Sequence, residues 1–293
     1  MFVMLLSGQI PAKAVEQELA DGEATSEAIK IPEPPKYITY FEDNFEGDDL
    51  AEHWEIINPD PEYFIVENGV LTVLSSSKIT IDSQDNLPNI FRLTKDLPSG
   101  DWKATIRFTP ELSTLRENYS LGLYSDNENM LMGFLGNRLA NGNIALNLTG
   151  IKISKGKKTS FNTLALAGSV HGFGGLHANF SNYANWVQNN ERSVEFKIEK
   201  TGRSYVFSTR VEGDFTAANG TENEWVKLQK LTSLRSPGKS LVLAFNQSGG
   251  HPSYTIQGGE SLTNIEWVKI EIKDNTPAVE TAIEATTESA TVE

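Results

Sequence analysis

Residues 37–54, YITYFEDNFEGDDLAEHW, mark the point where an acidic leader gives way to a folded domain. Over residues 37–45 the side chains alternate with the period of a β-strand, and one face would carry Tyr37, Phe41 and Asp43. Asp43 is unusual beside aromatic neighbours, because an unpaired carboxylate in a core is strongly destabilising. We therefore expect Asp43 to lie at the rim of the core or to have a specific partner.

The last regular stretch, residues 264–273 with the sequence NIEWVKIEIK, has the same period. Its alternation places Glu266 on the face of Val268 and Ile270, and the charged residues between them on the opposite face. If the first and last strands pair, as the ends of a closed sandwich often do, Asp43 and Glu266 would lie close together. Two neighbouring carboxylates can hold a hard cation such as Ca²⁺ through their oxygens.

The composition indicates one acidic domain with two tails. The formal net charge is −14, of which residues 1–36 and 274–293 together contribute −8. Residues 15–36 are predicted to be a disordered acidic, Pro-rich linker, and residues 274–293 a disordered acidic tail. The remaining residues contain no basic stripe that could neutralise phosphates, so we expect no nucleic-acid partner.

The sequence contains no cysteine, which excludes thiol catalysis, disulfides and thiolate metal sites. Residues 1–14, MFVMLLSGQIPAKA, combine a short apolar run with an A-x-A pattern at Ala12 and Ala14, which indicates a partial signal peptide. We therefore expect a secreted, periplasmic or cell-surface protein, with a disordered cytosolic leader as the alternative. No run of about 18 apolar residues occurs, so we expect no transmembrane segment.

Short alternating stretches separated by Gly and Asn turns predict the fold. Asn68 and Gly69 separate two β-rich runs, and Asn-Gly is the strongest short signal for a hairpin. Residues 102–109 alternate apolar with polar side chains, which predicts a strand with one buried and one wet face. Roughly a dozen such strands with almost no helical period predict an all-β domain over residues 37–273, a two-sheet antiparallel β-sandwich of the jelly-roll type.

A segment without regular period, about residues 155–190, is rich in glycine and aromatic residues. A loop of this length in a compact domain is usually functional or disordered, and its aromatics argue against disorder. Aromatic faces pack against sugar rings, while polar side chains bond the hydroxyls. The candidate glycan-binding residues in this insert and in the 247–259 loop are His171, Phe173, His177, Tyr183, Trp186, Gln247, His251 and Tyr254.

Several motifs, taken in order, resemble the concanavalin A-like lectin and glucanase superfamily. The likeness is greatest to the C-terminal domain of family 43 β-xylosidases and its free-standing relatives, and it spans about residues 37–273. The motifs that carry it are DNFEG (43–47) followed by Leu50 and Trp54, VENGVLTV (66–73), FRLTKDLPSGDWKATIRFTP (91–110), SLGLYSDNENMLMGF (120–134) and NIEWVKIEI (264–272).

The resemblance implies a concanavalin A-like jelly roll with a concave face, a carbohydrate ligand and often a structural calcium near the paired terminal strands. It carries over Asp43, the carbonyl of Gly47 and Glu266 as candidate calcium ligands. Glu266 stands where the family usually has Asp, so this ligand departs from the family pattern. Asn264 and Asp48 could complete the oxygen shell, because Ca²⁺ takes about six to eight oxygens.

Three functions fit these observations. Sandwich glucanases present the catalytic pattern Glu-x-Asp-x-x-Glu on one strand, and this pattern is absent from the sequence. Glu195 and Glu199 are a pair of carboxylates on one strand face, but they flank a lysine and are typical of an ordinary solvent-exposed face. We therefore favour a secreted carbohydrate-binding protein, lectin-like or accessory, that recognises a poly- or oligosaccharide without catalysis. The alternative is a glycoside hydrolase or a polysaccharide lyase on the same scaffold, with His171 or His177 and Tyr183 as candidate bases. A structural or adhesive surface protein is the third hypothesis.

Overall fold

The computed structural model describes most of the predicted domain, namely residues 35–75, 79–81, 86–110, 117–140, 143–162, 193–211, 225–232, 238–247 and 261–274. The chain divides into two compact units, Met1–Pro34 and Pro35–Glu293. All of the described residues belong to the second unit. The predicted signal peptide, nearly all of the linker and the tail beyond residue 274 lie outside the described residues. No helix in the described part of the chain is long and apolar enough to cross a membrane.

The described residues form an all-β domain, as predicted. Apart from one short 3-10 helix, η1 (Pro61–Tyr63), every regular element is a strand. In chain order these are β1 (Tyr37–Asp43), β2 (Trp54–Ile57), β3 (Phe64–Glu67), β4 (Val70–Ser75), β5 (Ile90–Asp96), β6 (Trp102–Pro110), β7 (Glu117–Asp126), β8 (Asn129–Ala140), β9 (Asn143–Ser154), β10 (Lys157–Asn162), β11 (Val194–Thr201), β12 (Ser204–Val211), β13 (Val226–Leu231), β14 (Ser240–Gln247) and β15 (Ser261–Lys273).

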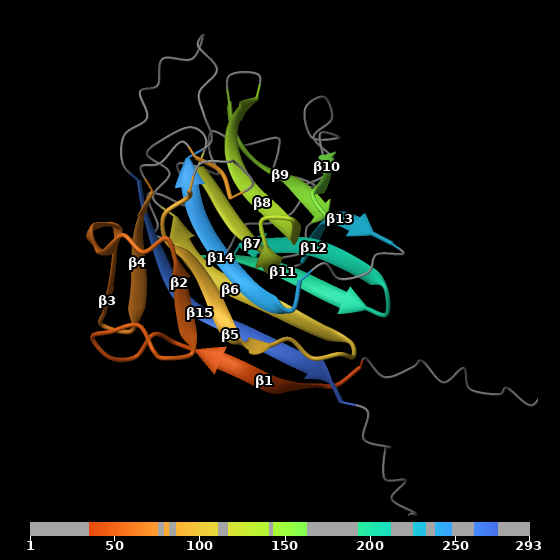
Figure 1. Cartoon of the computed structure of the whole chain (residues 1–293), viewed down its shortest axis with the longest axis horizontal. Helices are drawn as coiled ribbons and strands as arrows, with labels where there is room; N and C mark the ends of the chain where they lie inside the picture. Colours follow the sequence, from red (N-terminus) through yellow and green to blue (C-terminus); the bar gives the residue numbers. More distant parts are fainter. Residues whose placement is uncertain are drawn as a thin grey trace, which may run out of the picture. The chain divides into compact units, whose positions relative to one another are not determined.

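The strands form two antiparallel sheets that pack as a sandwich (Figure 1). The larger sheet has eight strands in the order β13-β12-β11-β6-β15-β4-β3, with β1 also paired to β15. The smaller sheet has seven strands in the order β10-β9-β8-β7-β14-β5-β2. The two-sheet antiparallel sandwich predicted from the sequence is therefore confirmed.

Aromatic side chains join the two sheets across the core. The rings of Phe108 in the larger sheet and Tyr119 in the smaller sheet lie 4.6 Å apart between centroids, and those of Phe64 and Phe91 lie 5.6 Å apart. Along β6 the predicted apolar face, Trp102 to Phe108, is buried, and the polar residues between point outward. The predicted alternation of this strand is confirmed, but its outward side chains are only partly exposed, and Thr105 is buried.

The two sheets differ on their outer faces. The smaller sheet carries a second cluster of buried apolar side chains, including Met130, Met132 and Val242, against which Ile79 packs. This explains why its strands read as nearly continuous apolar runs instead of alternating. The larger sheet has charged and polar side chains on its outer face, among them Lys103, Glu195 and Arg210.

The predicted hairpin at Asn68-Gly69 is present between β3 and β4. Both turn residues have positive φ, 54° for Asn68 and 75° for Gly69. A two-residue hairpin of type I′ requires this conformation at both positions, and Asn and Gly adopt it at the lowest cost. The sequence signal therefore identified both the turn and its backbone geometry.

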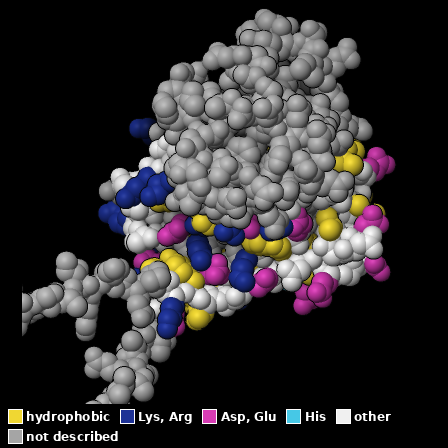
Figure 2. All heavy atoms as spheres, turned by 180° about the vertical axis from the view of Figure 1, so that it is seen from behind, with side chains coloured by type: hydrophobic (Ala, Val, Ile, Leu, Met, Phe, Trp, Pro, Cys, Tyr) yellow, Lys and Arg dark blue, Asp and Glu magenta, His cyan; other side chains and the backbone are white. Residues whose placement is uncertain are grey.

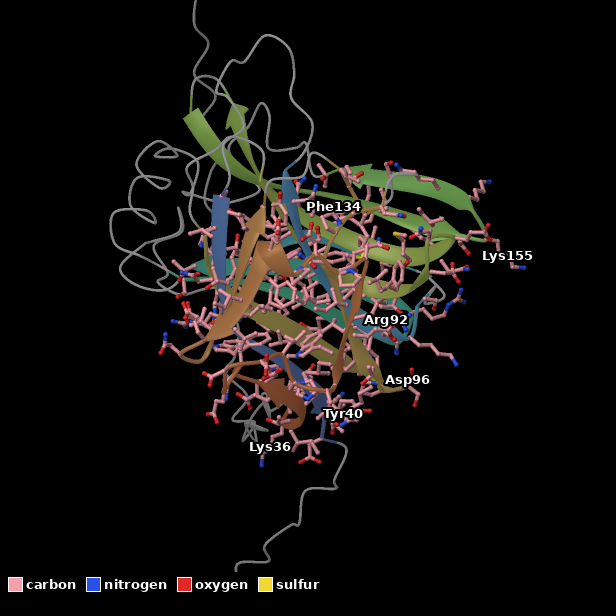
Figure 3. All side chains as sticks on the ribbon, turned by 60° about the vertical axis from the view of Figure 1, so that its left-hand side comes forward. Lys36, Tyr40, Arg92, Asp96, Phe134 and Lys155 are labelled. Atoms are coloured by element: carbon pink, nitrogen blue, oxygen red, sulfur yellow. The ribbon has the colours of Figure 1, made fainter. Side chains whose placement is uncertain are left out.

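The first strand departs from the predicted alternation. The first and last strands do pair, as predicted, but the register shifts between Thr39 and Phe41, so Tyr40 is an extra residue. Tyr40 bonds the carbonyl of Asp96 at 2.9 Å (Figure 3). Such a β-bulge reverses the inward and outward positions on one side of it. The prediction that Tyr37 shares a face with Phe41 and Asp43 is therefore wrong.

A second bulge changes the last strand. In the pairing of β15 with β6, the register shifts between Ile265 and Trp267. Glu266 consequently bonds Arg107 on the outer face, while Trp267 lines the same face and Val268 is fully buried. The prediction that Glu266 shares a face with Val268 is wrong, because the extra residue restarts the alternation after it.

A pair of glycines makes room for the aromatic side chains beneath β8 and β9. Gly133 lies opposite Gly150 in the register of these strands. A Cβ on Gly133 would lie 2.5 Å from the ring of Phe207, a core residue of the larger sheet. That ring is stacked between Phe196 and Phe161, with centroids 5.9 Å away in each case, so it has little freedom to move.

We expect Gly133→Ala to lower the free energy of unfolding by about 1–3 kcal/mol, because the added methyl overpacks this contact. Gly100→Ala is the matched control, since a Cβ there meets nothing within 4 Å. Urea denaturation followed by tryptophan fluorescence measures both variants. Equal stability of Gly133→Ala and the parent protein would show that the sheets are less tightly packed here than described.

Candidate functional site

A hollow of about 460 Å³ opens on the outer face of the larger sheet. Figure 2 shows this side of the molecule, where basic, acidic and hydrophobic side chains gather in one band. We call it the outer-face hollow, and define it by its lining residues: Glu42, Lys103, Thr105, Glu195, Lys197, Arg210, Trp225, Trp267, Lys269 and Glu271.

Strand pairing brings these side chains together from distant parts of the sequence. Trp267 on β15 lies opposite Arg107 on β6, which lies opposite Glu195 on β11, which in turn lies opposite Arg210 on β12. The hollow therefore crosses neighbouring strands instead of following one. With strands about 4.8 Å apart, the five strands from β1 to β12 place its ends roughly 19 Å apart.

Every carboxylate that lines the hollow has a cationic partner. Glu42 Oε2 lies 3.2 Å from Lys269 Nζ, and Glu271 Oε2 lies 3.1 Å from Lys103 Nζ. Glu195 lies between the guanidinium groups of Arg107 and Arg210.

Glu195 is the most deeply placed of these acids, with only 7% of its side chain exposed. Its Oε2 accepts a hydrogen bond from Arg210 Nε at 2.6 Å, and its Oε1 lies 3.6 Å from Arg107 Nη1. A buried carboxylate is tolerated only with such partners. Glu195 therefore fixes the positions of two arginine side chains, of which Arg210 lines the hollow.

Two tryptophans line the hollow in different settings. Trp225 carries two cations on its ring: Lys197 Nζ lies 4.0 Å and Arg210 Cζ 4.8 Å from the ring centroid. Trp267 is half-buried, and within the described part of the chain its indole has no ring or cation partner. Trp267 is therefore the indole that can offer a ring face to a ligand.

Lys197, which lines the hollow, and Tyr37, whose ring contacts the lining residue Lys103, have shifted pKa values. Burial lowers the pKa of Lys197, and the positive charges of Lys103 and Arg210 lower it further, against an opposing effect of Glu199. Burial also raises the pKa of the Tyr37 phenol, and the negative charge of Glu199 adds to that effect. Lys197 is thus a cation whose charged form is disfavoured mainly by its burial.

Asp43 has specific partners at the rim of the core, as expected. Its Oδ1 accepts the backbone N–H of Phe45 at 2.8 Å, and its Oδ2 accepts Trp54 Nε1–H at 2.6 Å. His53 Nε2 lies 2.7 Å from the same Oδ2. Because Trp54 belongs to the smaller sheet and Asp43 to the larger one, this carboxylate joins the two sheets.

The candidate calcium ligands are not brought together. Glu266 lies on the outer face, where it accepts hydrogen bonds from Arg107 Nε at 2.5 Å and Thr109 Oγ1 at 2.9 Å, and also from Ser193. Asn264 Oδ1 is bonded by Thr72 Oγ1 at 2.9 Å.

Asp43 therefore lies on the opposite face of the sheet from Glu266, and Gly47 and Asp48 follow β1 in a loop. Within the described residues no three His, Asp or Glu side chains are grouped to hold a metal. The residues do not fit the predicted calcium shell, and calcium binding stays a prediction.

The predicted glycan-binding residues cannot be compared with this site. His171, Phe173, His177, Tyr183, Trp186, His251 and Tyr254 all lie outside the described residues. Gln247 is the last residue of β14, and the structure describes its backbone only. Their role in binding stays a prediction.

Sequence reasoning missed the tryptophans of the hollow. Trp267 falls in phase with Lys269 and Glu271, so the alternation already placed an aromatic residue on a charged face. Trp225 directly precedes β13 and gave no such signal. An aromatic residue on a predicted wet face was the available clue to this site.

Comparisons with known proteins support the fold. The chain resembles a mutant of the GH43 protein BlXynB from Bacillus licheniformis, with a TM-score of 0.53 and 12% identity over 80% of this chain and 39% of that one. It also resembles a xylan β-1,4-xylosidase from Bacillus halodurans, with a TM-score of 0.50 and 14% identity over 83% of this chain and 41% of that one.

The chain thus spans about 40% of the length of these proteins. No protein-family model and no curated protein matches the sequence. At this identity the likeness shows the fold alone, and it confirms the concanavalin A-like β-sandwich that the sequence motifs predicted.

We expect Asp43→Asn to lower the free energy of unfolding by about 1–3 kcal/mol, because the amide cannot accept from both Trp54 and Phe45 as the carboxylate does. Denaturation should be measured in EDTA, since the hydrogen bonds need no ion. If EDTA alone destabilises the parent protein by the same amount, a bound cation and not these hydrogen bonds holds the site.

Proposed function

We propose that this protein binds a poly- or oligosaccharide in the outer-face hollow and does not cleave it. The observation that carries the proposal is the indole of Trp267, which lines a polar hollow and has no ring or cation partner among the described residues. An aromatic face beside fixed hydrogen-bonding groups is the combination that sugar rings need, because sugars have apolar C–H patches and polar hydroxyls.

The size and chemistry of the hollow support an extended ligand. Its ends lie roughly 19 Å apart, which exceeds a single sugar ring. The ion pairs along it, such as Lys269 with Glu42 and Lys103 with Glu271, offer donors and acceptors whose positions are already fixed. Groups that are fixed before binding lose less conformational entropy when the ligand arrives.

The arrangement of carboxylates favours binding over hydrolysis. A glycoside hydrolase needs one carboxylic acid that keeps its proton and a second carboxylate across the scissile bond. In the hollow Glu42, Glu195 and Glu271 are each paired with Lys or Arg, so no carboxyl group that lines it is left without a cationic partner.

The fold is consistent with a carbohydrate ligand. The two similar structures are named as a GH43 protein and a xylan β-1,4-xylosidase. This chain corresponds to less than half of each, so their fold supports the class of ligand and not the reaction.

A polysaccharide lyase is a second candidate, favoured by Lys197. A lyase needs a base to remove a proton from the sugar, and burial lowers the pKa of this lysine within the hollow. The proposal of binding alone expects no new unsaturated or reducing ends after incubation with plant and algal polysaccharides. Unsaturated ends that disappear in Lys197→Met would establish the lyase instead.

We expect Trp267→Ala to weaken polysaccharide retention in affinity gel electrophoresis by at least about tenfold, because the ring face that packs on the sugar is lost. The fold should be intact, since the side chain lies on the outer face. Ile38→Ala is the control, because Ile38 is 50% exposed and does not line the hollow. Unchanged retention by Trp267→Ala would move the site elsewhere in the chain.

A further inference from the structure

We propose that the glycan bound in the outer-face hollow is acidic, and that the guanidinium of Arg210 binds its anionic group, the carboxylate of a uronic acid or a sulfate ester. This inference rests on the proposed function, because it specifies the ligand class of the same site. It is carried by the way in which Arg210 is held and by the donors that this leaves unused.

Arg210 is fixed on two sides. Its Nε donates to Glu195 Oε2 at 2.6 Å, and its Cζ lies 4.8 Å from the centroid of the Trp225 ring. The carboxylate therefore sets the direction of the guanidinium, and the indole restricts the position of its plane. An arginine held in this way loses little rotamer entropy when it binds a ligand.

The terminal Nη groups of Arg210 are left for a ligand. Neither donates a hydrogen bond to any residue in the part of the chain that the structure describes, and 36% of the side chain is exposed. A planar pair of N–H donors matches the two oxygens of a carboxylate or sulfate, so both can be bonded at once. A neutral hydroxyl has only one oxygen, so it cannot accept from both N–H donors in this parallel arrangement.

The charge around Arg210 also favours an anion. Four of the lining side chains are basic and three are acidic, although the whole chain has a net charge of −14. The nearest acid, Glu195, is only 7% exposed, and both of its carboxylate oxygens already face guanidinium groups. This carboxylate therefore presents little free negative charge to a ligand in the hollow.

Lys197 adds a second cation on the same indole. Its Nζ lies 4.0 Å from the Trp225 centroid and 3.5 Å from Glu199 Oε2, and only 12% of its side chain is exposed. The burial and neighbouring cations that lower its pKa make its charged form costly in the free protein. An anionic group near Arg210 and Lys197 would offset that cost, which a neutral sugar cannot do.

The test compares polysaccharides that differ only in charge, using the full-length protein at about 0.15 M salt to screen long-range repulsion. Polygalacturonate and its methyl-esterified form isolate the carboxylate, and a sulfated galactan and its desulfated form isolate the sulfate ester. Affinities are measured by isothermal titration calorimetry for the parent protein, Arg210→Lys and Arg92→Lys.

Arg210→Lys keeps the positive charge beside Glu195 but removes the planar pair of donors. Arg92→Lys is the matched control, because Arg92 pairs with Glu55 on the smaller sheet, away from the hollow (Figure 3). Thermal unfolding of both variants verifies that each is folded.

We expect one anionic polysaccharide to bind at least about tenfold more tightly than its neutral form. Arg210→Lys should remove most of that difference, and Arg92→Lys should leave it unchanged. Equal binding of charged and neutral forms, or no effect of Arg210→Lys, would overturn the acidic ligand and leave glycan binding in place. Failure of every polysaccharide to bind would count against the proposed function itself.

Discussion

The position of β15 within the larger sheet is the constraint on which the rest of the structure depends. This strand pairs with β6 along one edge and with β4 and then β1 along the other, so it joins both ends of the domain to its centre. The bulge before Trp267 turns Glu266 and Trp267 to the same outer face. Without that extra residue, the alternation would place an indole or a carboxylate in the core.

Ion pairs organise the outer face that β15 helps to form. Glu195 is buried, yet it is held by Arg107 and Arg210, so its charge positions two cations, one of which, Arg210, lines the hollow. Removing one partner of such a group is costly, which makes the network rigid. In the proposed function, these donors and the indoles of Trp225 and Trp267 together form the glycan-binding surface.

The sequence predicted the sandwich because local patterns determine strands and turns. The alternation of residues 102–109 and the Asn68-Gly69 hairpin both correspond to the structure. It could not predict the bulges at Tyr40 and after Ile265, because a bulge is defined by the partner strand and not by the strand itself. The wet faces of β6, β11 and β15 were visible in the sequence, but their adjacency was not, since it depends on pairings between residues 86 to 170 positions apart.

The most direct test of glycan binding in the outer-face hollow uses the five tryptophan indole N–H signals in a two-dimensional NMR spectrum, titrated with an oligosaccharide that the protein retains. If the glycan binds in the hollow, the indole N–H signals of Trp225 and Trp267 should shift together and reach a plateau as the ligand concentration rises. The signals of the buried Trp54 and Trp102 should not shift. A shift of Trp186 alone, with Trp225 and Trp267 unchanged, would contradict the hollow as the site and assign binding to the Gly-rich insert.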